Sequence, residues 1–281
     1  MSVTITSNSL TVSQLIAADV PVIMGILNVT PDSFSDGGEF DRIDAAVARA
    51  LEMQSQGASI IDVGGESTRP GAQPVDVNQE IARVVPVIET IRRQSDIQIS
   101  IDTSKPEVMK AAVMAGANLV NDVNALCAEG AVTCCAELSV PVCLMHMQGE
   151  PRTMQKNPEY SDVVNEVREF LLERARFCIE AGIAADQILL DPGFGFGKTL
   201  KHNLQLLSRL DELCALDFRV LVGFSRKSML GAILDRAVDQ RVIGGVAAAV
   251  IAYSKGARWF RVHDVAETSD ALKVCMALNQ V

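Results

Sequence analysis

The chain has 281 residues, enough for one large domain or two small ones, and no tract rich in proline, serine and glycine divides it. Apolar residues make up 48% of the sequence and aromatic residues only 4%, so a core must be built mainly from Val, Ile, Leu, Ala and Met. The net charge of −10 argues against a nucleic-acid surface and against binding to anionic membranes, and an anionic ligand therefore needs a local basic cluster.

Targeting signals and cysteines are consistent with a cytoplasmic protein. No Lys or Arg precedes Arg42, so the positive start of a signal peptide is missing. The longest apolar window, Val242–Ser254, is too short to span a membrane and is typical of a buried helix. The cysteines form no Cys-x-x-Cys pair, and this scattered, odd-numbered set predicts reduced thiols: Cys127, Cys134, Cys135, Cys143, Cys178, Cys214 and Cys275.

Short apolar runs that end in turn residues predict strands buried on both faces, as in a parallel sheet. The clearest run, Ile60–Val63, precedes a pair of glycines and a polar loop. Eight such strands are expected, at Val22–Val29, Ser59–Val63, Ile97–Asp102, Asn118–Asp122, Pro141–His146, Ile188–Asp191, Arg219–Phe224 and Trp259–Val262.

Helical spacing of apolar residues alternates with these strands. One helix is expected to begin at a capping box formed by Ser104 and Glu107 and to end at Gly116. The others are expected around Ile43–Gln54, Val77–Arg93, Ala131–Leu138, Asp162–Glu180, Asn203–Leu210, Lys227–Ser254 and Glu267–Leu278.

Eight strand-then-helix units predict an α/β fold, a (β/α)₈ TIM barrel in a single domain over residues 21–281, after a lead-in over residues 1–20. A doubly wound open sheet is the alternative. Polar residues at the strand ends favour the barrel, because there they would converge on one cavity: Asn28, Asp62, Asp102, Asn121, His146, Asp191, Ser225 and His263.

Three of these strand ends offer hydrogen-bond acceptors. Asp102 and Asp191 each end a buried apolar run, and Asn121 ends another. Carboxylate and amide oxygens at fixed angles suit a planar heterocycle that carries N–H donors. Acids that merely cap the following helices are the structural alternative.

Cations follow the last two strands. Lys227 is a candidate donor to a ring carbonyl or nitrogen, whereas Arg226 could equally form a structural ion pair. Arg261 and His263 alternate along the last strand and so point the same way, which predicts an anion site at the usual phosphate position of a barrel.

Two nucleotide-binding motifs are incomplete. Gly197-Lys198-Thr199 resembles the end of a P-loop, but Pro192 occupies the position of the required first glycine. The glycines at 193, 195 and 197 are spaced two apart and miss the dinucleotide-binding pattern. Neither nucleotide hypothesis survives.

Longer motifs resemble the bacterial dihydropteroate synthases of the pterin-binding family. Residues 25–38 (GILNVTPDSFSDGG) and 62–71 (DVGGESTRPG) are similar to the two signatures of that family. Shorter matches lie at 101–106 (IDTSKP), 144–148 (LMHMQ), 191–198 (DPGFGFGK), 225–228 (SRKS) and 261–264 (RVHD), so that the resemblance covers nearly the whole chain.

The resemblance implies a Mg²⁺-dependent homodimer that joins a dihydropterin diphosphate to 4-aminobenzoate and releases diphosphate. It implies Asn28 as the metal ligand and Asp102, Asp191 and Lys227 as catalytic residues. The implied substrate-binding residues are Phe34, Asp36, Thr68, Arg69, Pro70, Asp102, Asn121, Met145, Asp191, Phe196, Lys227, Ser228, Arg261 and His263.

Three other functions remain open at this point. A pterin-binding methyltransferase barrel would share the ring-binding acids but would not need the Thr68–Arg69 loop or the Arg261 and His263 pair. An aldolase would form a Schiff base on Lys227, and a non-catalytic relative would only hold a pterin.

Overall fold

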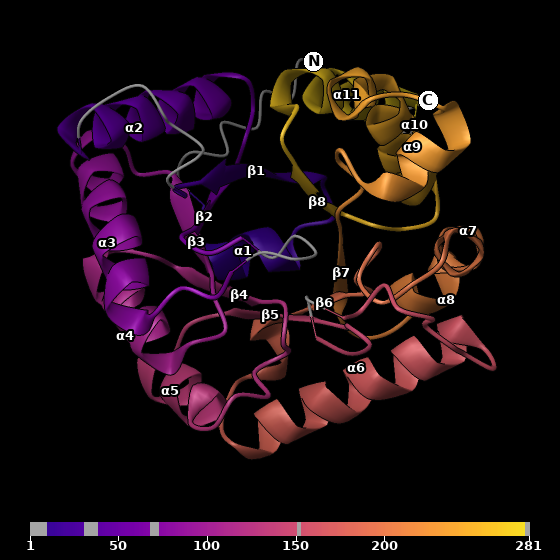
Figure 1. The fold of residues 1–281 in the computed structure, drawn as a ribbon, viewed down its shortest axis with the longest axis horizontal. Helices are drawn as coiled ribbons and strands as arrows, with labels where there is room; N and C mark the ends of the chain where they lie inside the picture. Colours follow the sequence, from indigo (N-terminus) through magenta and orange to yellow (C-terminus); the bar gives the residue numbers. More distant parts are fainter. Residues whose placement is uncertain (1–9, 31–38, 68–72, 151–152, 279–281) are drawn as a thin grey trace.

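Eight parallel strands form a closed barrel in the computed structural model, which describes residues 10–30, 39–67, 73–150 and 153–278 (Figure 1). Each strand pairs with the next, and the last pairs with the first. The predicted (β/α)₈ barrel is therefore confirmed over the open sheet. The strands are β1 (Val22–Asn28), β2 (Ile60–Gly64), β3 (Gln98–Asp102), β4 (Leu119–Asp122), β5 (Val142–Met145), β6 (Ile188–Asp191), β7 (Arg219–Val222) and β8 (Trp259–Val262).

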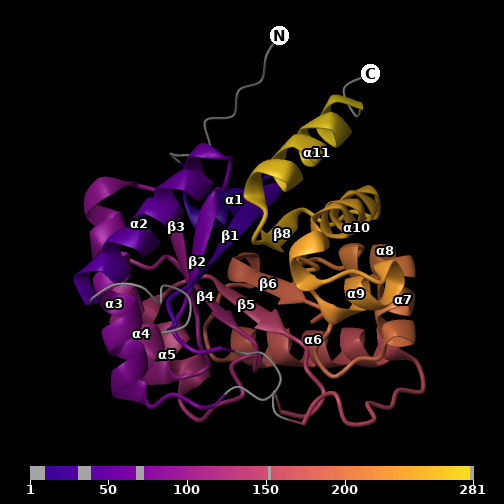
Figure 2. The same ribbon diagram turned by 45° about the horizontal axis from the view of Figure 1, so that its top comes forward.

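The helices that follow β1 surround the barrel in the order of the chain, as Figures 1 and 2 show. The expected helix over 227–254 is divided into two, because Asp235 adopts a left-handed conformation that ends the first part. The helices are α1 (Val12–Ala17), α2 (Glu39–Ser55), α3 (Val77–Gln94), α4 (Pro106–Ala115), α5 (Ala131–Leu138), α6 (Val163–Glu180), η3 (Ala185–Gln187), α7 (Leu200–Ser208), α8 (Leu210–Cys214), α9 (Ser228–Leu234), η4 (Val238–Gln240), α10 (Val242–Ser254) and α11 (Val265–Leu278).

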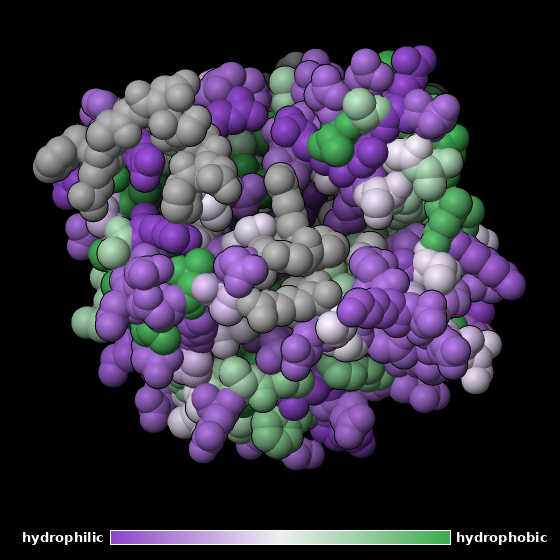
Figure 3. Space-filling model, in the orientation of Figure 1, coloured by the Kyte–Doolittle hydropathy of each residue, from purple (hydrophilic) through white to green (hydrophobic). Residues whose placement is uncertain are grey.

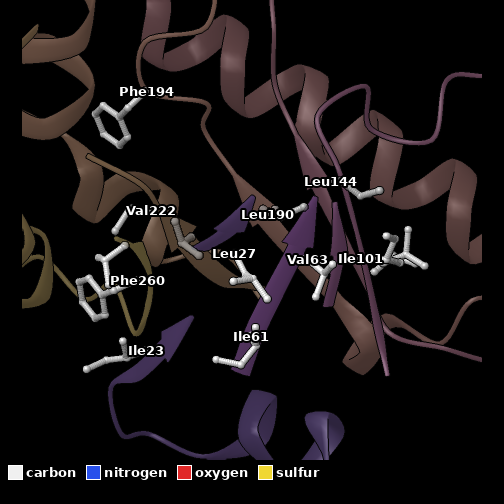
Figure 4. Packing of buried hydrophobic residues seen from close by; sticks show 14 of the residues in the cluster. Ile23, Leu27, Ile61, Val63, Ile101, Leu144, Leu190, Phe194, Val222 and Phe260 are labelled. Carbon is white, nitrogen blue, oxygen red and sulfur yellow. The ribbon is translucent and has the colours of Figure 1, made fainter. Parts of the chain in front are cut away.

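The larger core lies between the strands and the surrounding helices. Successive side chains of a strand point to opposite faces, and those that leave the barrel meet the apolar faces of the helices. Figure 4 shows part of this layer at close range, with Val222 and Phe260 on one side and Val63 and Ile101 on the other. Packing on both faces of each strand explains the nearly continuous apolar runs in the sequence.

The helix α1 closes the amino-terminal end of the barrel. Its Val12, Leu15 and Ile16 are buried against a second apolar cluster inside the barrel, which includes Met24 and Trp259. In Figure 1, α1 is seen across the opening of the strand ring. The polar chemistry is thereby confined to the other end, where the strands finish.

The predicted capping box at Ser104 is wrong. The N-cap of α4 is Lys105, which makes no side-chain cap hydrogen bond, and Pro106 occupies the first helical turn. The Ser104 hydroxyl instead donates to the buried carboxylate of Asp122 on β4. A long-range partner therefore takes the hydroxyl that the local pattern assigned to the helix, because a buried carboxylate requires donors.

Candidate active site

Four polar side chains at the carboxyl ends of the strands are joined by direct contacts. Arg261 Nε donates to Asp62 Oδ2 at 2.6 Å, and Arg261 Nη2 donates to Asp102 Oδ2 at 2.6 Å. Asn121 Nδ2 also donates to Asp62 Oδ2, at 3.2 Å. The two acids and the amide are buried, while Arg261 is partly exposed. The barrel thus brings together residues from β2, β3, β4 and β8, as predicted for converging strand ends.

The carboxyl group of Asp102 is subject to opposing electrostatic effects. Burial raises its pKa to about 7, the nearby charge of Asp62 adds to this rise, and the Arg261 guanidinium opposes it. Its Oδ1 atom is buried and has no hydrogen-bond partner among the described residues. A group poised near neutral pH, with an acceptor atom still available, is typical of a functional carboxylate.

Asp191 and Lys227 form the second half of the site. Lys227 Nζ donates to the carbonyl oxygen of Phe194 and lies 4.8 Å from the centre of the Phe196 ring. Burial lowers the pKa of Lys227 to about 8, the charge of Arg261 adds to this fall, and Asp191 opposes it. Burial raises the pKa of Asp191, against the charge of Lys227 and a hydrogen bond from Gly193 N at 2.7 Å.

A glycine separates the two halves. An added Cβ at Gly223, just after β7, would lie 3.7 Å from Arg261 Cβ and 3.9 Å from Lys227 Nζ. The missing side chain leaves room beside both cations. Any planar ligand placed here would therefore have carboxylates, an amide and two cations within its reach.

The other predicted site residues are more scattered. Met145 is buried at the end of β5, Ser228 is exposed at the start of α9, and Phe196 is partly exposed. His263 Nδ1 lies 3.0 Å from the Oγ atom of Ser225. Five predicted residues lie outside the described part of the chain: Phe34, Asp36, Thr68, Arg69 and Pro70.

The expectation that His146 faces the cavity is wrong. Cys143 of β5 packs inside the barrel and Leu144 packs in the outer core, so alternation turns Met145 inward and the next side chain outward. The His146 ring meets the edge of Phe170 on α6, and Nδ1 lies 2.9 Å from Lys198 Nζ. Burial and the charge of Lys198 lower the pKa of His146 to about 3. His146 is therefore a packing residue behind the site.

The lysine of the incomplete P-loop motif has a structural role. Lys198 is buried, and its Nζ donates to the carbonyl oxygens of Gly193 (3.0 Å), Phe196 (3.0 Å) and His146 (3.3 Å). Burial lowers its pKa well below the usual value. Lys198 thus fixes the loop that carries Phe194 and Phe196 toward Lys227. The other open alternative, a structural ion pair for Arg226, is confirmed by its 2.8 Å contact with Asp264.

Two oxygen atoms near the end of β1, Asn28 Oδ1 and Asp102 Oδ2, fit a cation that binds together with a substrate. An added Cβ at Gly64 would lie 3.8 Å from both Asn28 Oδ1 and Asp102 Oδ2, so two oxygens approach the same bare backbone. Within the described residues, no group of three His, Cys, Asp or Glu side chains is arranged to hold a metal. Mg²⁺ does not require such a cage, since it keeps waters and often binds through one or two protein oxygens and substrate phosphates.

Sequence reasoning left two functional neighbours without a role. The sequence pattern predicts Asp62 as a strand-end acid without a partner, whereas in the structure it accepts hydrogen bonds from Arg261 and Asn121. The pattern associates Lys198 only with an incomplete P-loop, whereas in the structure it donates to backbone carbonyl oxygens. The sequence signal for Asp62 is a single acid within the apolar run of residues 60–63, and the structure places it at the middle of β2, in register with Ser100 of β3.

Comparison with known proteins identifies the relatives of this chain. The family model described as "Pterin binding enzyme" matches residues 24–263. The dihydropteroate synthase of Haemophilus influenzae is 54% identical over 258 residues, which cover 92% of this chain and 94% of the relative, and that of Escherichia coli K12 is 52% identical, with 92% and 91% covered.

A solved structure of the Xanthomonas albilineans dihydropteroate synthase with 4-aminobenzoic acid is also similar. It is 52% identical, with a TM-score of 0.89 and 94% of each chain covered. Family model, sequence identity and fold agree over most of the chain. The chain belongs to the pterin binding enzymes and, within them, to the dihydropteroate synthases.

Proposed function

We propose that this chain joins (7,8-dihydropterin-6-yl)methyl diphosphate to 4-aminobenzoate and gives 7,8-dihydropteroate and diphosphate. The observation that carries the proposal is the buried set of acceptors, Asp102, Asn121 and Asp191, beside the cations Lys227 and Arg261. A similar Xanthomonas albilineans dihydropteroate synthase, 49% identical with a TM-score of 0.86, has been solved with 7,8-dihydropteroate.

The strand ends recognise the pterin ring through complementary hydrogen bonds. Asn121 and Asp191 supply acceptors for the ring N–H groups, and Lys227 supplies a donor for a ring carbonyl or nitrogen. Phe196 lies against the Lys227 ammonium and adds an apolar surface beside the ring. Met145 lines the buried end of β5. Five residues outside the described part of the chain are proposed to complete the 4-aminobenzoate pocket: Phe34, Asp36, Thr68, Arg69 and Pro70.

The chemistry requires stabilisation of charge more than transfer of a proton to the enzyme. The bond between the pterin methylene and the diphosphate oxygen breaks, and its electron pair leaves with the diphosphate. The arylamine nitrogen donates its lone pair to the methylene carbon and then loses a proton to water. Asp102 stabilises the positive charge that develops on the pterin methylene, while Arg261 and His263 bind the leaving anion. An arylamine is already nucleophilic, so a strong base is not required.

We propose that Mg²⁺ accompanies the diphosphate, with the Asn28 amide oxygen as its protein ligand. When bound, the ion neutralises negative charge on the leaving group. The Asn28 amide oxygen would hold the ion, while Arg261 on β8 and His263 just after it would hold the anion. Ser228, at the start of α9, is proposed to contact the substrate beside Lys227.

A cytoplasmic homodimer is the proposed form of the protein. All seven cysteines are free thiols, as expected in a reducing compartment. Among the described residues, no helix has the length and apolar character to cross a membrane. Exposed apolar side chains, including Ile233, Val238 and Ile243, gather over α9, η4 and α10, where Figure 3 shows a hydrophobic area at its upper right. A patch of this kind suits contact with a second copy.

The decisive assay measures diphosphate release from the pterin diphosphate with and without 4-aminobenzoate, and detects dihydropteroate by mass. Release that requires 4-aminobenzoate and yields equimolar product is expected. Methyl transfer from a methylated pterin to a corrinoid, without dihydropteroate formation, would instead support the methyltransferase alternative. Trapping of a covalent adduct on Lys227 by borohydride would support the aldolase.

A further inference from the structure

The carboxylate of Asp62 connects two proposed ligand-binding side chains. Its Oδ2 atom accepts hydrogen bonds from Arg261 Nε and from Asn121 Nδ2. The residue is 0% exposed and lies at the middle of β2, between Ile61 and Val63. A side chain with no exposed surface influences a ligand at the mouth through its neighbours, and both of its neighbours are proposed to touch the substrate.

Asp62 determines which end of the Asn121 amide is presented to a ligand. A carboxylate that is paired with a guanidinium accepts hydrogen bonds and donates none. The Asn121 NH₂ group must therefore face Asp62, and the Oδ1 atom must point the other way, as an acceptor. The flipped amide would place two oxygens against each other and would offer a donor where a pterin presents its own N–H groups.

Asp62 also orients the Arg261 guanidinium. This planar fork is held at Nε by Asp62 and at Nη2 by Asp102. Among the described residues, nothing accepts a hydrogen bond from Nη1, which leaves donors for an anion. Without Asp62, the guanidinium would keep only its contact with Asp102, and the direction of the remaining N–H donors would no longer be fixed at Nε.

We infer that Asp62 is a positioning residue, which fixes Asn121 as an acceptor for the pterin ring and Arg261 as a donor for the diphosphate. The inference rests on the proposed function for the identity of the ligand. The hydrogen-bond geometry of Asp62, Asn121 and Arg261 carries the rest.

A double-mutant cycle tests the path through Asn121. The affinity for bare 6-hydroxymethyl-7,8-dihydropterin is measured by calorimetry in the wild type, D62A, N121A and the double variant. D62A is expected to weaken binding about tenfold in the wild-type background and less than about twofold in N121A. D62N, which keeps an acceptor, is expected to retain most of the affinity. An equal loss in both backgrounds would overturn the inference.

Ser100 offers a matched control, since it is the register partner of Asp62, is buried, and has an Oγ atom without a hydrogen-bond partner among the described residues. S100A is expected to bind the pterin as the wild type does, and a loss equal to that of D62A would mean a general defect of the barrel interior. The path through Arg261 is tested in the same way, by titrating inorganic diphosphate into the wild type, D62A, R261A and the double variant. D62A is expected to weaken diphosphate binding less when Arg261 is absent.

A ligand-free measurement separates this inference from the proposed function. The Asn121 side-chain amide signals, identified by their loss in N121A, are expected to exchange slowly in the wild type and in S100A and to shift in D62A. Unshifted signals would overturn the inference even if dihydropteroate is formed. If the Asn121 signals shift in D62A and the double-mutant cycle gives the expected result, but the protein forms no dihydropteroate, the inference stands and the proposed function is overturned.

Discussion

Asp102 combines a buried carboxylate, an adjacent guanidinium and an oxygen without a partner among the described residues. Asp102→Asn keeps the shape and one acceptor but removes the charge. The activation free energy is expected to rise by about 3 kcal/mol, so that turnover falls roughly a hundredfold. The reason is that the Asp102 carboxylate is proposed to stabilise the positive charge that develops on the pterin methylene. Diphosphate affinity should change little.

Steady-state kinetics and calorimetry check this prediction. Asp96→Asn removes the same charge from an exposed position near the other end of β3 and should leave turnover unchanged. Near-normal turnover in folded Asp102→Asn would contradict the role given to Asp102.

A bell-shaped pH profile of kcat/KM is expected from two shifted groups. Below about pH 7, Asp102 takes up a proton and loses the charge that stabilises the methylene, so the rate falls. Above about pH 8, Lys227 loses its proton and its charge, and the rate falls again. The profile should therefore peak between these values. Lys227→Arg should move the alkaline limb to higher pH, and a flat wild-type profile from pH 6 to pH 9 would contradict both assignments.

At the scale of elements, the short helix α1 contributes to the stability of the whole barrel. Leu15 is buried in the cluster that closes the amino-terminal end. Leu15→Ala is expected to lower the free energy of unfolding by about 2–5 kcal/mol, through lost burial and a cavity. Denaturant unfolding measures this, and Ala17→Gln, at an exposed position of the same helix, serves as the control. A loss below about 1 kcal/mol would mean that the barrel is stable without the helix.

Most elements could be predicted from local patterns, because buried parallel strands and amphipathic helices have strong periodic signals. The strands over 188–191 and 259–262 have the predicted bounds, and the others differ by one or two residues at one or both ends. The break between α9 and α10 was not predicted, since it depends on the left-handed Asp235.

The contacts within the site could be predicted only in part. Convergence of Asp102, Asn121 and Arg261 follows from the closed barrel, but their partners are separated by long stretches of chain, as in the pairing of Asp62 with Arg261. Ser104 and His146 were misassigned for the same reason. A hydroxyl or an imidazole takes the best partner that folding brings to it, and in these two residues that partner lies on another element.

At the scale of the whole molecule, the apolar surface of α9, η4 and α10 is the predicted interface of the proposed homodimer. Ile243 is 84% exposed at the start of α10. Ile243→Glu is expected to convert the proposed dimer to a monomer in light scattering, because a buried charge in an apolar contact is costly. Met114→Glu, at a residue 77% exposed on α4, should leave the dimer intact. A dimer that survives Ile243→Glu would place the interface elsewhere.

Because α1 closes the amino-terminal end of the barrel, it limits how substrates enter the site and how products leave it. With Leu15 and Trp259 filling the amino-terminal end, both substrates must arrive, and both products must depart, through the same opening at the carboxyl ends of the strands. Under the proposed function, the pterin ring would occupy the deeper position, among the strand ends. It is then expected to bind before 4-aminobenzoate, and the joined product is expected to leave as one piece. The order of substrate binding and product release then follows from the shape of the barrel and does not depend on the chemical step.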